Sequence, residues 1–472
     1  MFFSKKLEEF MLRGTSSVNG LLYYVEKYID PNQFAVSGSS CTHALIRIID
    51  FILKNTDGGQ LPKAVVNLLA DWSKAFNKCN HNIFVKILID MKIPEWLLRL
   101  ITSYLEHRKM VVRFRGVTSN QKSIPGSAPQ GTLLGGALYV LYINPIGFPS
   151  EFTEKLNLAL NEIGDHPESS ILRNQHEPSL PETVKSIKFM DDATIQETID
   201  LNTALCSNID RSGPLPFHES SGKVLPASNS LLQHQIIEIK RISDEREMVL
   251  NAKKTCIFIA NFTDNHQFKP LLSIPGVNKV IETVQETKLL GYWLTSNMKP
   301  NKHIQYIVKR SLGKIWAIRR LKEAGASDND LKYFYIMMIR SILETNCPVF
   351  HTQLTDENTE NIERVQKIVT KIILSYRYEN YDEAHIYLDL DSLSQRRENL
   401  CLTFALKCLK NDKHKTLFKL SDPTEHDFRT KSLFEEQYAR TARYYNSPVL
   451  ALTRILNDYF LKNPDVCKKR FS

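Results

Sequence analysis

The chain has 472 residues, 42% hydrophobic and 24% charged, proportions that are typical of a globular protein and exclude a largely disordered one. The net charge of +9 allows a polyanionic partner without proving one. No apolar run reaches the roughly 18 residues that a bilayer-spanning helix requires, so we expect no membrane partner.

The eight cysteines are scattered along the chain, and none of them forms a C-x-x-C pair. No histidine cluster completes a zinc site. The N-terminal residues lack the apolar core of a signal peptide. We therefore expect reduced thiols and an intracellular protein, cytoplasmic or nuclear rather than secreted.

In chain order, a predicted helix at 41–54 precedes a nearly continuous apolar run at 65–70. Such a run predicts a buried strand, and this one ends at Asp71. Two helices are expected next, at 82–91 and 95–106. A hairpin around Gly116 and a helix at 132–142 follow.

Two adjacent acids, Asp191 and Asp192, stand between apolar flanks that predict two short strands joined by a tight turn. Carboxylates this close repel each other unless a cation lies between them or one takes up a proton. Hard oxygen ligands suit Mg²⁺, with Mn²⁺ as an alternative. For an isolated pair, a solvated Asp-Asp turn is the simpler interpretation.

The type of secondary structure that the sequence predicts changes near residue 300. Polar segments at 145–184 and 211–229 predict insertions, whereas beyond residue 300 every expected element is a helix. No compact fold is predicted for 411–472. Before residue 300, a helix is expected at 231–249 and strands at 256–260 and 288–294. Beyond it, helices are expected at 302–322, 328–344, 358–374 and 392–410.

Three segments occur in a fixed order: LADWSKAFN at 69–77, GSAPQGTLLG at 126–135 and FMDD at 189–192. Together they resemble motifs A, B and C of reverse transcriptases, and most closely those of non-LTR (long interspersed element-type) retrotransposons. Segments at 250–255 and 288–291 resemble motif D and the primer grip of the same family. The resemblance covers roughly residues 30 to 410.

The resemblance implies an α+β, right-hand polymerase with an antiparallel palm sheet, partial fingers and a helical thumb. Because the match begins near residue 30, the N-terminal fingers are expected to be missing or very short. The implied organisation is partial fingers at 1–60, palm at 61–270, primer-grip strands at 271–300, thumb at 301–410 and a basic C-terminal tail at 411–472.

The implied activity is RNA-directed DNA synthesis, in which dNTPs are added to the 3′ end of a DNA primer on an RNA template. Two divalent ions about 4 Å apart serve this chemistry. By resemblance, Asp71 and Asp191 bridge the two ions, and Asp192 is the third carboxylate of the site. The alternative role for Asp71 is a helix N-cap.

Four residues are expected at the nucleotide. The Trp72 carbonyl directly follows Asp71 and can reach a metal ion. The Phe76 ring, by resemblance, packs under the sugar and excludes a 2′-hydroxyl, although a plain core role is equally open from the sequence. Gln130 and Gly131 would let the template–nucleotide pair lie close to the backbone, unless they form an ordinary glycine turn.

Further contacts are implied for the pyrophosphate and the primer. Lys254 would stabilise the leaving pyrophosphate, and spacing favours it over Lys253. Leu290 and Gly291 would place the primer end. A basic helix would follow the nucleic-acid backbone or simply carry a solvated face; its cations are Lys309, Arg310, Lys314, Arg319 and Arg320.

Some positions depart from the family pattern. Asn77 stands where an aspartate is usual, and Ser37 and Ser39 stand where a cation would grip the triphosphate. These departures support a second hypothesis, a catalytically inactive nucleic-acid-binding remnant. A third hypothesis, an RNA-dependent RNA polymerase, is disfavoured by the bulk of Phe76.

Overall fold

The structure is a computed structural model, and its contacts divide the chain into two compact units. Unit 1 comprises Met1–Ser39, Val66–Phe258 and Asp264–Val284, and unit 2 comprises Ser40–Val65, Ile259–Thr263 and Gln285–Ser472. The structure describes residues 2–59, 63–73, 75–106, 108–124, 126–146, 184–200, 223–225, 231–263, 268–270, 272–277, 280–421 and 432–464.

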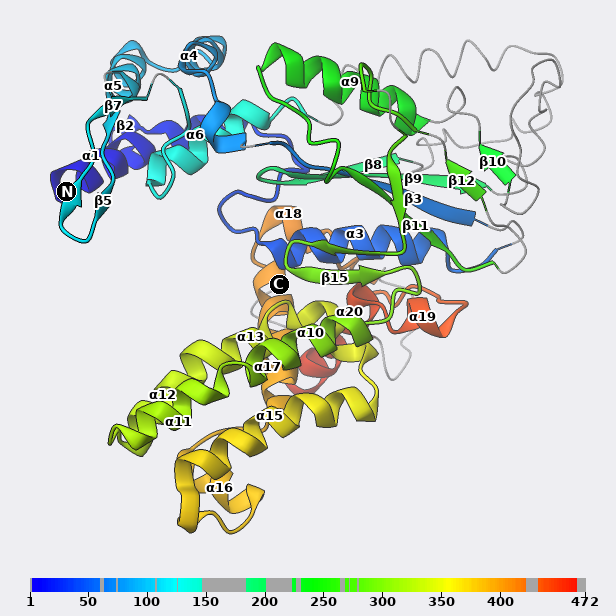
Figure 1. Cartoon of the computed structure of the whole chain (residues 1–472). Coiled ribbons are helices and arrows are strands. Elements are labelled where there is room, and N and C mark those ends of the chain that lie inside the picture. Colours follow the sequence, from blue (N-terminus) through cyan, green and yellow to red (C-terminus); the bar gives the residue numbers. More distant parts are fainter. Residues whose placement is uncertain are drawn as a thin grey trace, which may run out of the picture. The chain divides into compact units, whose positions relative to one another are not determined.

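A five-stranded sheet, in the order β13-β11-β3-β9-β8, forms the centre of unit 1 (Figure 1). Its strands are β3 (Lys63–Ala70), β8 (Val184–Phe189), β9 (Asp192–Asp200), β11 (Cys256–Asn261) and β13 (Glu282–Val284). Seven of the eight residues of β3 are buried, as its unbroken apolar run predicts. β8 and β9 are antiparallel, but β11 and β13 are parallel, so the expectation of an antiparallel sheet is wrong at that edge.

The helices of unit 1, together with its sheet, confirm the α+β class. α9 contacts β9, and α6 packs against α1, α2 and α4. α6 is apolar on nearly all sides, which suits a helix enclosed by others. The helices of unit 1 are α1 (Phe2–Arg13), α2 (Leu21–Tyr28), α4 (His81–Asp90), α5 (Glu95–Leu105), α6 (Leu133–Ile143) and α9 (Leu231–Glu245).

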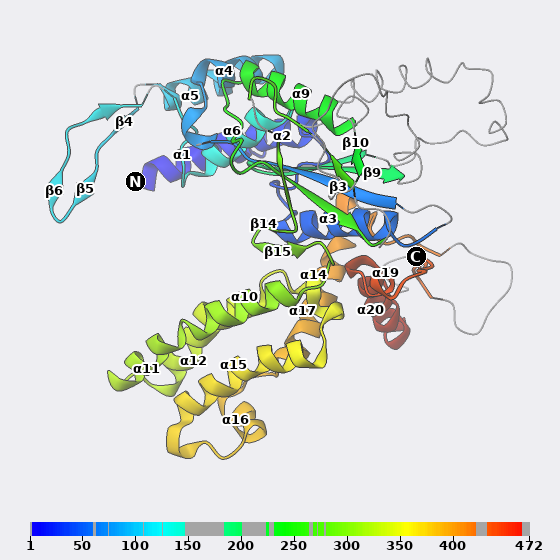
Figure 2. The ribbon, with the colours of Figure 1, turned by 45° about the vertical axis from the view of Figure 1, so that its right-hand side comes forward.

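A long two-part hairpin extends from unit 1 between α5 and α6 (Figure 2). β4 pairs with β7 at its base, and β5 pairs with β6 at its tip. The predicted hairpin around Gly116 is therefore confirmed. Its strands are β4 (Lys109–Met110), β5 (Arg113–Phe114), β6 (Val117–Thr118) and β7 (Lys122–Ser123).

Unit 2 consists mainly of helices, together with the hairpin of β14 (Glu286–Leu289) and β15 (Tyr292–Thr295). α3 (Cys41–Asn55) packs against α14, α19 and α20, so this segment of the expected fingers has its contacts within unit 2. The other helices are α10 (Asn301–Leu312), α11 (Ile315–Glu323), α12 (Asp328–Tyr335), α13 (Ser341–Glu344), α14 (Cys347–Phe350), α15 (Asp356–Leu374), α16 (Tyr381–Leu388), α17 (Leu393–Cys408), α18 (Asp412–Lys415), α19 (Ala442–Tyr445) and α20 (Pro448–Lys462).

Three predicted elements differ from the structure. The predicted strand at 288–294 is a hairpin, and the predicted helix at 302–322 is two helices separated at Gly313–Lys314. The region beyond residue 410 is not without a compact fold, because α20 buries one face against α17 and α3. A short apolar helix within a polar segment gives little sequence signal until its partners are known.

The predicted insertions lie outside the described residues, apart from the edges of 145–184 and the strand β10 (Lys223–Leu225) within 211–229. The six cysteines in the described ranges are free thiols. No helix in the described ranges is both long and apolar enough to cross a membrane.

Candidate active site

Asp71 directly follows β3, where the buried strand ends and its side chain reaches partial exposure. Its backbone carbonyl accepts a hydrogen bond from the Asn251 amide at 2.8 Å, and its Oδ2 accepts one from Asn251 Nδ2 at 3.1 Å. Lys254 Nζ lies 3.5 Å from the same Oδ2. The motif A acid is therefore held by the segment that resembles motif D.

Asp191 and Asp192 lie at the turn of the β8–β9 hairpin. Phe189 pairs with Asp192, which leaves a two-residue loop of Met190 and Asp191. Met190 has a φ of 53°, in the left-handed region that costs a residue with a side chain about 1–2 kcal/mol. A strained turn next to two acids is the kind of feature that marks a functional site.

The three acids are close enough to affect one another electrostatically. β3 and β9 are neighbours in the sheet. Gln196 Nε2, four residues after Asp192, donates to Asn67 Oδ1, four residues before Asp71, at 2.8 Å. The end of β3 and the start of β9 therefore lie at the same edge of the sheet. Burial, and then the negative charges of Asp191 and Asp71, together raise the pKa of Asp192 to about 6, against the opposing effect of Lys254. The sheet thus gathers an excess of negative charge at this edge.

The donor types at this edge fit a hard divalent cation, because all three side chains offer carboxylate oxygens. A cation would also relieve the repulsion that raises the pKa of Asp192. Within the described residues, however, no three or more His, Cys, Asp or Glu side chains already form a metal-binding group. Binding would therefore require these carboxylates to turn toward the ion.

Phe76 lies half-buried, five residues after Asp71 in the sequence. Its ring stacks on Tyr139 of α6 at a centroid distance of 3.9 Å and an interplanar angle of 19°. Tyr139 is fully buried, and its pKa is raised by burial and then by the charge of Asp191. The Phe76 ring therefore has a rigid support while one part of it remains exposed.

The segment that resembles motif B is tied to the Phe76 segment by its backbone. The Ala128 amide donates to the Phe76 carbonyl at 2.8 Å. Gln130 and Gly131 are both exposed, Gln130 Nε2 lies 3.4 Å from Asn77 Oδ1, and Gly131 has a φ of 76° that favours glycine. Both residues thus remain accessible to a ligand.

The side chain of Trp72 is buried and donates from Nε1 to Ser243 Oγ at 2.9 Å. Trp72 forms an isolated antiparallel bridge with Leu250. The hydrogen bonds on either side of this bridge use the Asp71 carbonyl and the Ser73 amide. In an antiparallel pair this pattern directs the Trp72 carbonyl toward the opposite edge of the strand.

Sequence reasoning did not find a buried ion pair behind the acidic turn. Lys188 of β8 is 1% exposed, and its Nζ lies 2.5 Å from Asp30 Oδ2 and 2.8 Å from the Asn144 carbonyl oxygen. The Phe34 amide also donates to the Lys188 carbonyl at 2.7 Å. The one available signal was a lysine within a strand whose neighbours are apolar or small.

No family model matches the chain. Among curated proteins, a probable RNA-directed DNA polymerase from transposon X-element of Drosophila melanogaster is 31% identical over 119 residues. The match covers 25% of this chain and 13% of that protein. The resemblance to a non-LTR retrotransposon reverse transcriptase is confirmed over this stretch.

Among solved structures, the matches include three telomerases, at sequence identities of 11–12%. Telomerase from Candida tropicalis with the TWJ fragment of telomeric RNA has a TM-score of 0.35, over 82% of this chain and 52% of that chain. The Candida albicans complex has a TM-score of 0.31, over 88% and 57%. Apo telomerase from Candida tropicalis has a TM-score of 0.36, over 83% and 57%.

The predicted primer-grip residues form the turn of the β14–β15 hairpin in unit 2. Leu289 pairs with Tyr292, so Leu290 and Gly291 are the two loop residues. Their φ values are 48° and 82°. Positive φ at both positions is typical of a type I′ turn, which explains the glycine at the second one. Asn346 Nδ2 lies 3.4 Å from the Leu290 carbonyl oxygen.

The predicted nucleic-acid-binding cations lie on α10, on α11 and at the break between them. Lys309, Arg310 and Arg319 are exposed, and Lys314 is half-buried. Arg320 is exposed but forms an ion pair with Glu323 at 2.8 Å. These residues therefore keep most of their charge available to solvent or to a ligand.

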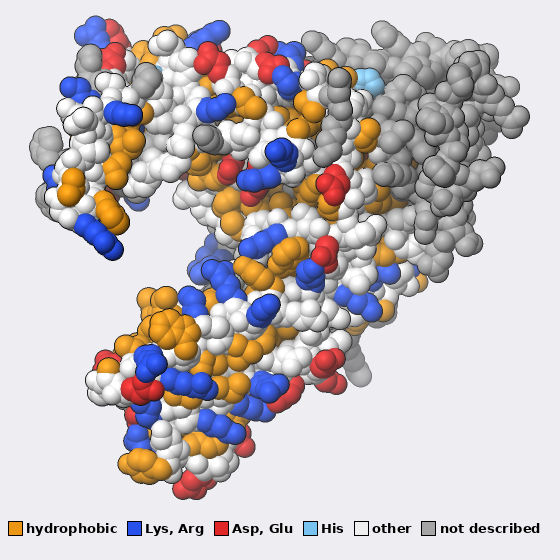
Figure 3. Space-filling view, viewed as in Figure 1, with side chains coloured by type: hydrophobic (Ala, Val, Ile, Leu, Met, Phe, Trp, Pro, Cys, Tyr) orange, Lys and Arg blue, Asp and Glu red, His pale blue; other side chains and the backbone are white. Residues whose placement is uncertain are grey.

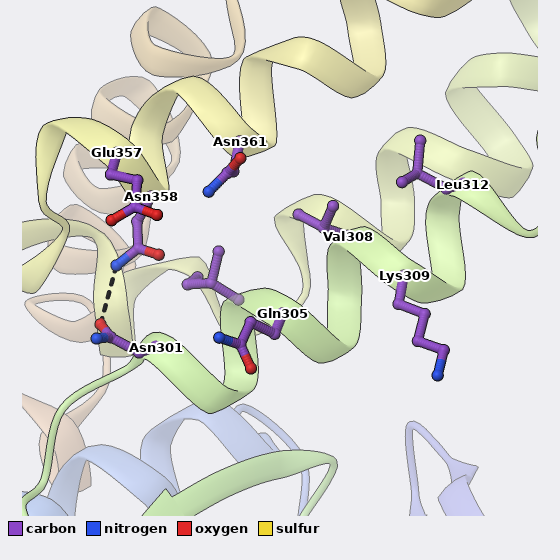
Figure 4. Close-up of a pocket in the computed structure, with 9 residues that line it drawn as sticks. Asn301, Gln305, Val308, Lys309, Leu312, Glu357, Asn358 and Asn361 are labelled. Carbon is purple, nitrogen blue, oxygen red and sulfur yellow. Dashed lines mark hydrogen bonds between the residues drawn. The ribbon is translucent and has the colours of Figure 1, made fainter.

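A groove of about 380 Å³ lies between α10 and α15 within unit 2 (Figure 4). Asn358 Nδ2 donates to Asn301 Oδ1 at 2.9 Å at one end of it. The groove is lined by Asn301, Ile304, Gln305, Val308, Lys309, Leu312, Glu357, Asn358 and Asn361. With a single acid in this lining, the groove does not offer the carboxylate set that the predicted chemistry needs.

Proposed function

We propose that this chain catalyses RNA-directed DNA synthesis, adding dNTPs to the 3′ end of a DNA primer on an RNA template. The observation that carries the proposal is that the end of β3, which Asp71 follows, and the β8–β9 turn, which holds Asp191 and Asp192, lie at the same edge of the sheet. The charges of Asp191 and Asp71 are close enough to Asp192 to raise its pKa. The match to a transposon RNA-directed DNA polymerase supports the same activity.

Asp71, Asp191 and Asp192 would hold the divalent ions. When bound, two such ions lower the pKa of the attacking 3′-hydroxyl and neutralise the leaving pyrophosphate. The carboxylates supply negative charge at fixed strand ends, and the Asn251 side chain orients Asp71 through its hydrogen bond to Oδ2. Rigid placement of ligands is what this chemistry requires of the protein.

Lys254 would stabilise the pyrophosphate through its charge. Its side chain is 69% exposed, although Nζ lies 3.5 Å from Asp71. An ion pair this open to solvent contributes little to stability and is readily exchanged for another anion. A phosphate group near Asp71 would therefore find a cation in reach.

Phe76 would select the sugar. The stack on Tyr139 fixes the ring, so the ring cannot easily move aside for a 2′-hydroxyl. Steric overlap in a packed pocket is costly enough to discriminate between dNTPs and rNTPs. The exposed positions of Gln130 and Gly131 suit contacts with the base pair above this sugar.

A catalytically inactive nucleic-acid-binding remnant is the second candidate. The absence of a ready-made metal-binding group among the described residues favours it, as do the uncharged Ser37 and Ser39. Under this alternative the exposed cations of α10 and α11 would still bind a nucleic-acid backbone. The two candidates differ in one property, nucleotide incorporation.

Primer extension on an RNA template, with dNTPs and rNTPs in separate reactions, tests the proposal. We expect dNTP incorporation by the wild type and by Asp90→Ala, an exposed acid of α4 that serves as the control. Asp191→Ala should abolish incorporation. Equal extension by the wild type and Asp191→Ala would refute the assignment, preferential rNTP use would refute the choice of substrate, and template binding without extension would favour the remnant.

A further inference from the structure

The hairpin of residues 108–124, hereafter the basic hairpin, is exposed on both of its faces. Every residue from 109 to 123 is exposed, and only its two ends, Arg108 and Ile124, are half-buried. Figure 2 shows it extending away from the helices of unit 1 that it joins. A two-stranded hairpin alone in water is at best marginally stable. Among the residues that the structure describes, the exposure of both faces leaves this one without the packing partner that a stable hairpin usually has.

The charges of the basic hairpin all have the same sign. Residues 108–124 contain no aspartate or glutamate. None of its cations belongs to an ion pair within the part of the chain that the structure describes. The cations are Arg108, Lys109, Arg113, Arg115 and Lys122. An unpaired cluster of this kind attracts a polyanion.

Large apolar side chains are exposed between these cations. The space-filling view shows hydrophobic and basic side chains side by side over the basic hairpin (Figure 3). Contiguous exposed apolar surface marks an interaction site more often than not. The exposed apolar residues are Met110 (53%), Val111 (43%), Val112 (58%), Phe114 (69%) and Val117 (73%).

The tip of the basic hairpin is well defined. Arg115 and Gly116 have φ values of 47° and 82° and form the two-residue turn between β5 and β6. Phe114 pairs with Val117, and cross-strand partners share a face, so the ring of Phe114 lies beside Val117. Arg113 lies on the opposite face, and the Arg115 guanidinium is 5.3 Å from the Phe114 ring centroid.

We propose that the basic hairpin binds a single strand of nucleic acid. Its cations match the phosphate backbone, and Phe114 with Arg115 offers a platform on which an unpaired base can stack. A duplex hides its base faces, so stacking of this kind selects single strands. The inference rests on the proposed function only for naming this strand as the RNA template.

An anionic membrane surface fits the basic hairpin less well. A loop that inserts into a membrane presents an apolar end with its cations set back from it. Here Arg113 and Arg115 flank Phe114 at the tip itself, so insertion of the ring would bring two guanidinium groups with it. A single strand of nucleic acid presents bases and phosphates in alternation, and the tip of the basic hairpin presents an aromatic ring between two guanidinium groups.

Binding of a fluorescein-labelled 20-nucleotide RNA, measured by anisotropy on the full chain, tests the inference. Arg113→Glu/Arg115→Glu should weaken binding at least about tenfold, because it removes phosphate contacts. The matched control, Lys27→Glu/Lys86→Glu, makes the same change in net charge at two exposed lysines of unit 1. An equal loss in both double variants would overturn the inference, because net charge alone would then explain binding.

Phe114→Ala isolates stacking from charge. We expect affinity for single-stranded RNA to fall about 5-fold or more, and Phe114→Tyr to retain it. Affinity for an RNA duplex should change little. An unchanged affinity in Phe114→Ala, or tighter wild-type binding to duplex than to single strand, would contradict the proposal. The proposal would also be contradicted if Phe114→Ala weakened binding to phosphatidylserine vesicles but left RNA binding unchanged.

The same variants separate this inference from the proposed function. If the wild type shows no primer extension while the hairpin variants still lose RNA affinity, the polymerase assignment fails and the inference stands. If the hairpin variants extend primers and bind RNA as the wild type does, the inference fails alone. Since the changed residues are exposed, circular dichroism melting should show unchanged folding in each variant.

Discussion

The carboxyl group of Asp192 lies in an environment that disfavours its charge. Burial contributes most, followed by Asp191 and Asp71, so that its pKa rises to about 6 from 3.8. In the unfolded chain the group returns to its ordinary pKa. Between about pH 4 and pH 6 the folded protein therefore binds this proton more tightly than the unfolded chain does, and ionisation of Asp192 destabilises the fold.

Asp192→Asn should remove this penalty. Without divalent ions, the wild type should lose free energy of unfolding as the pH rises from about 4 to about 6, and the variant should lose less. At pH 7.5 the variant should be more stable by on the order of 1–2 kcal/mol, a value reduced for the partial exposure of the group. Urea denaturation at pH 4.5, 6 and 7.5 measures this.

Two comparisons make the Asp192 experiment decisive. Mg²⁺ should stabilise the wild type at pH 7.5 and stabilise Asp192→Asn less, because the variant has lost one of the three carboxylates that would bind the ions. Asp90→Asn, at an exposed position, should behave as the wild type. An identical pH dependence in the wild type and Asp192→Asn would show that Asp192 does not carry the charge excess.

Phe76→Val should relax the choice of sugar. A smaller side chain relieves the overlap with a 2′-hydroxyl, so the preference for dNTP over rNTP should fall at least about tenfold in kcat/KM. Tyr139→Phe, which keeps the stacked ring, should preserve the preference. If Phe76→Val folds normally and its preference is unchanged, Phe76 is a core residue only.

How far single residues could be predicted depends on where their signal lies. Asp71, Asp191 and Asp192 could be chosen as candidates because the order of three short motifs is visible in the sequence itself. Asn251 and Asp30 were not, since their importance comes from partners 180 and 158 residues away. Contacts of that range are set by sheet order, which no local pattern contains.

At the scale of elements, the Lys188–Asp30 pair joins β8 to the segment before α3. Lys188 and Asp30 are 1% and 15% exposed as side chains. Burial lowers the pKa of Lys188, and the charge of Asp30 opposes this. The acidic turn of the β8–β9 hairpin begins two residues after Lys188, so this pair fixes the strand that presents Asp191 and Asp192.

Lys188→Met should cost about 3–5 kcal/mol of unfolding free energy, because it leaves the Asp30 charge buried without its partner. Lys188→Met/Asp30→Leu should recover most of that cost, since no buried charge then remains. A double-mutant cycle measured by urea denaturation gives the coupling. Additive effects, with each single change costing under about 1 kcal/mol, would show that the pair does not hold the strand.

Elements with an extended apolar pattern could be predicted from the sequence, whereas elements whose limits are set by turns could not. β3 and α15 follow from their apolar patterns alone. The β14–β15 hairpin was predicted as one strand because its turn contains Leu290, a residue that rarely adopts a positive φ. α20 was missed because its apolar face is satisfied by α17 and α3, which are distant in the sequence.

At the scale of the whole molecule, the net charge of +9 includes two groups of cations that lie close together along the chain. The basic hairpin of unit 1 and the cations of α10 and α11 in unit 2 are the two that the proposed function would use. Affinity for nucleic acid in such a protein comes largely from counterion release. Salt should therefore weaken binding steeply.

Arg319→Glu/Arg320→Glu should reduce the steepness of that dependence. A plot of log K against log salt for a primer–template duplex should lose about one in slope for each phosphate contact removed. Lys371→Glu/Lys407→Glu, a reversal at two lysines elsewhere in unit 2, should leave the slope nearer that of the wild type. Equal slopes for both variants would show that α11 does not contact the duplex.

The central claim is that three carboxylates at one edge of a sheet act together on divalent ions during nucleotide addition. Single-turnover incorporation of one dNTP, measured across a Mg²⁺ titration, tests it most directly. We predict ion-dependent incorporation by the wild type and Asp90→Asn, and a loss of at least about 10³-fold in each of Asp71→Asn, Asp191→Asn and Asp192→Asn. Incorporation within tenfold of the wild type in Asp71→Asn or Asp191→Asn, or incorporation independent of Mg²⁺, would contradict the account.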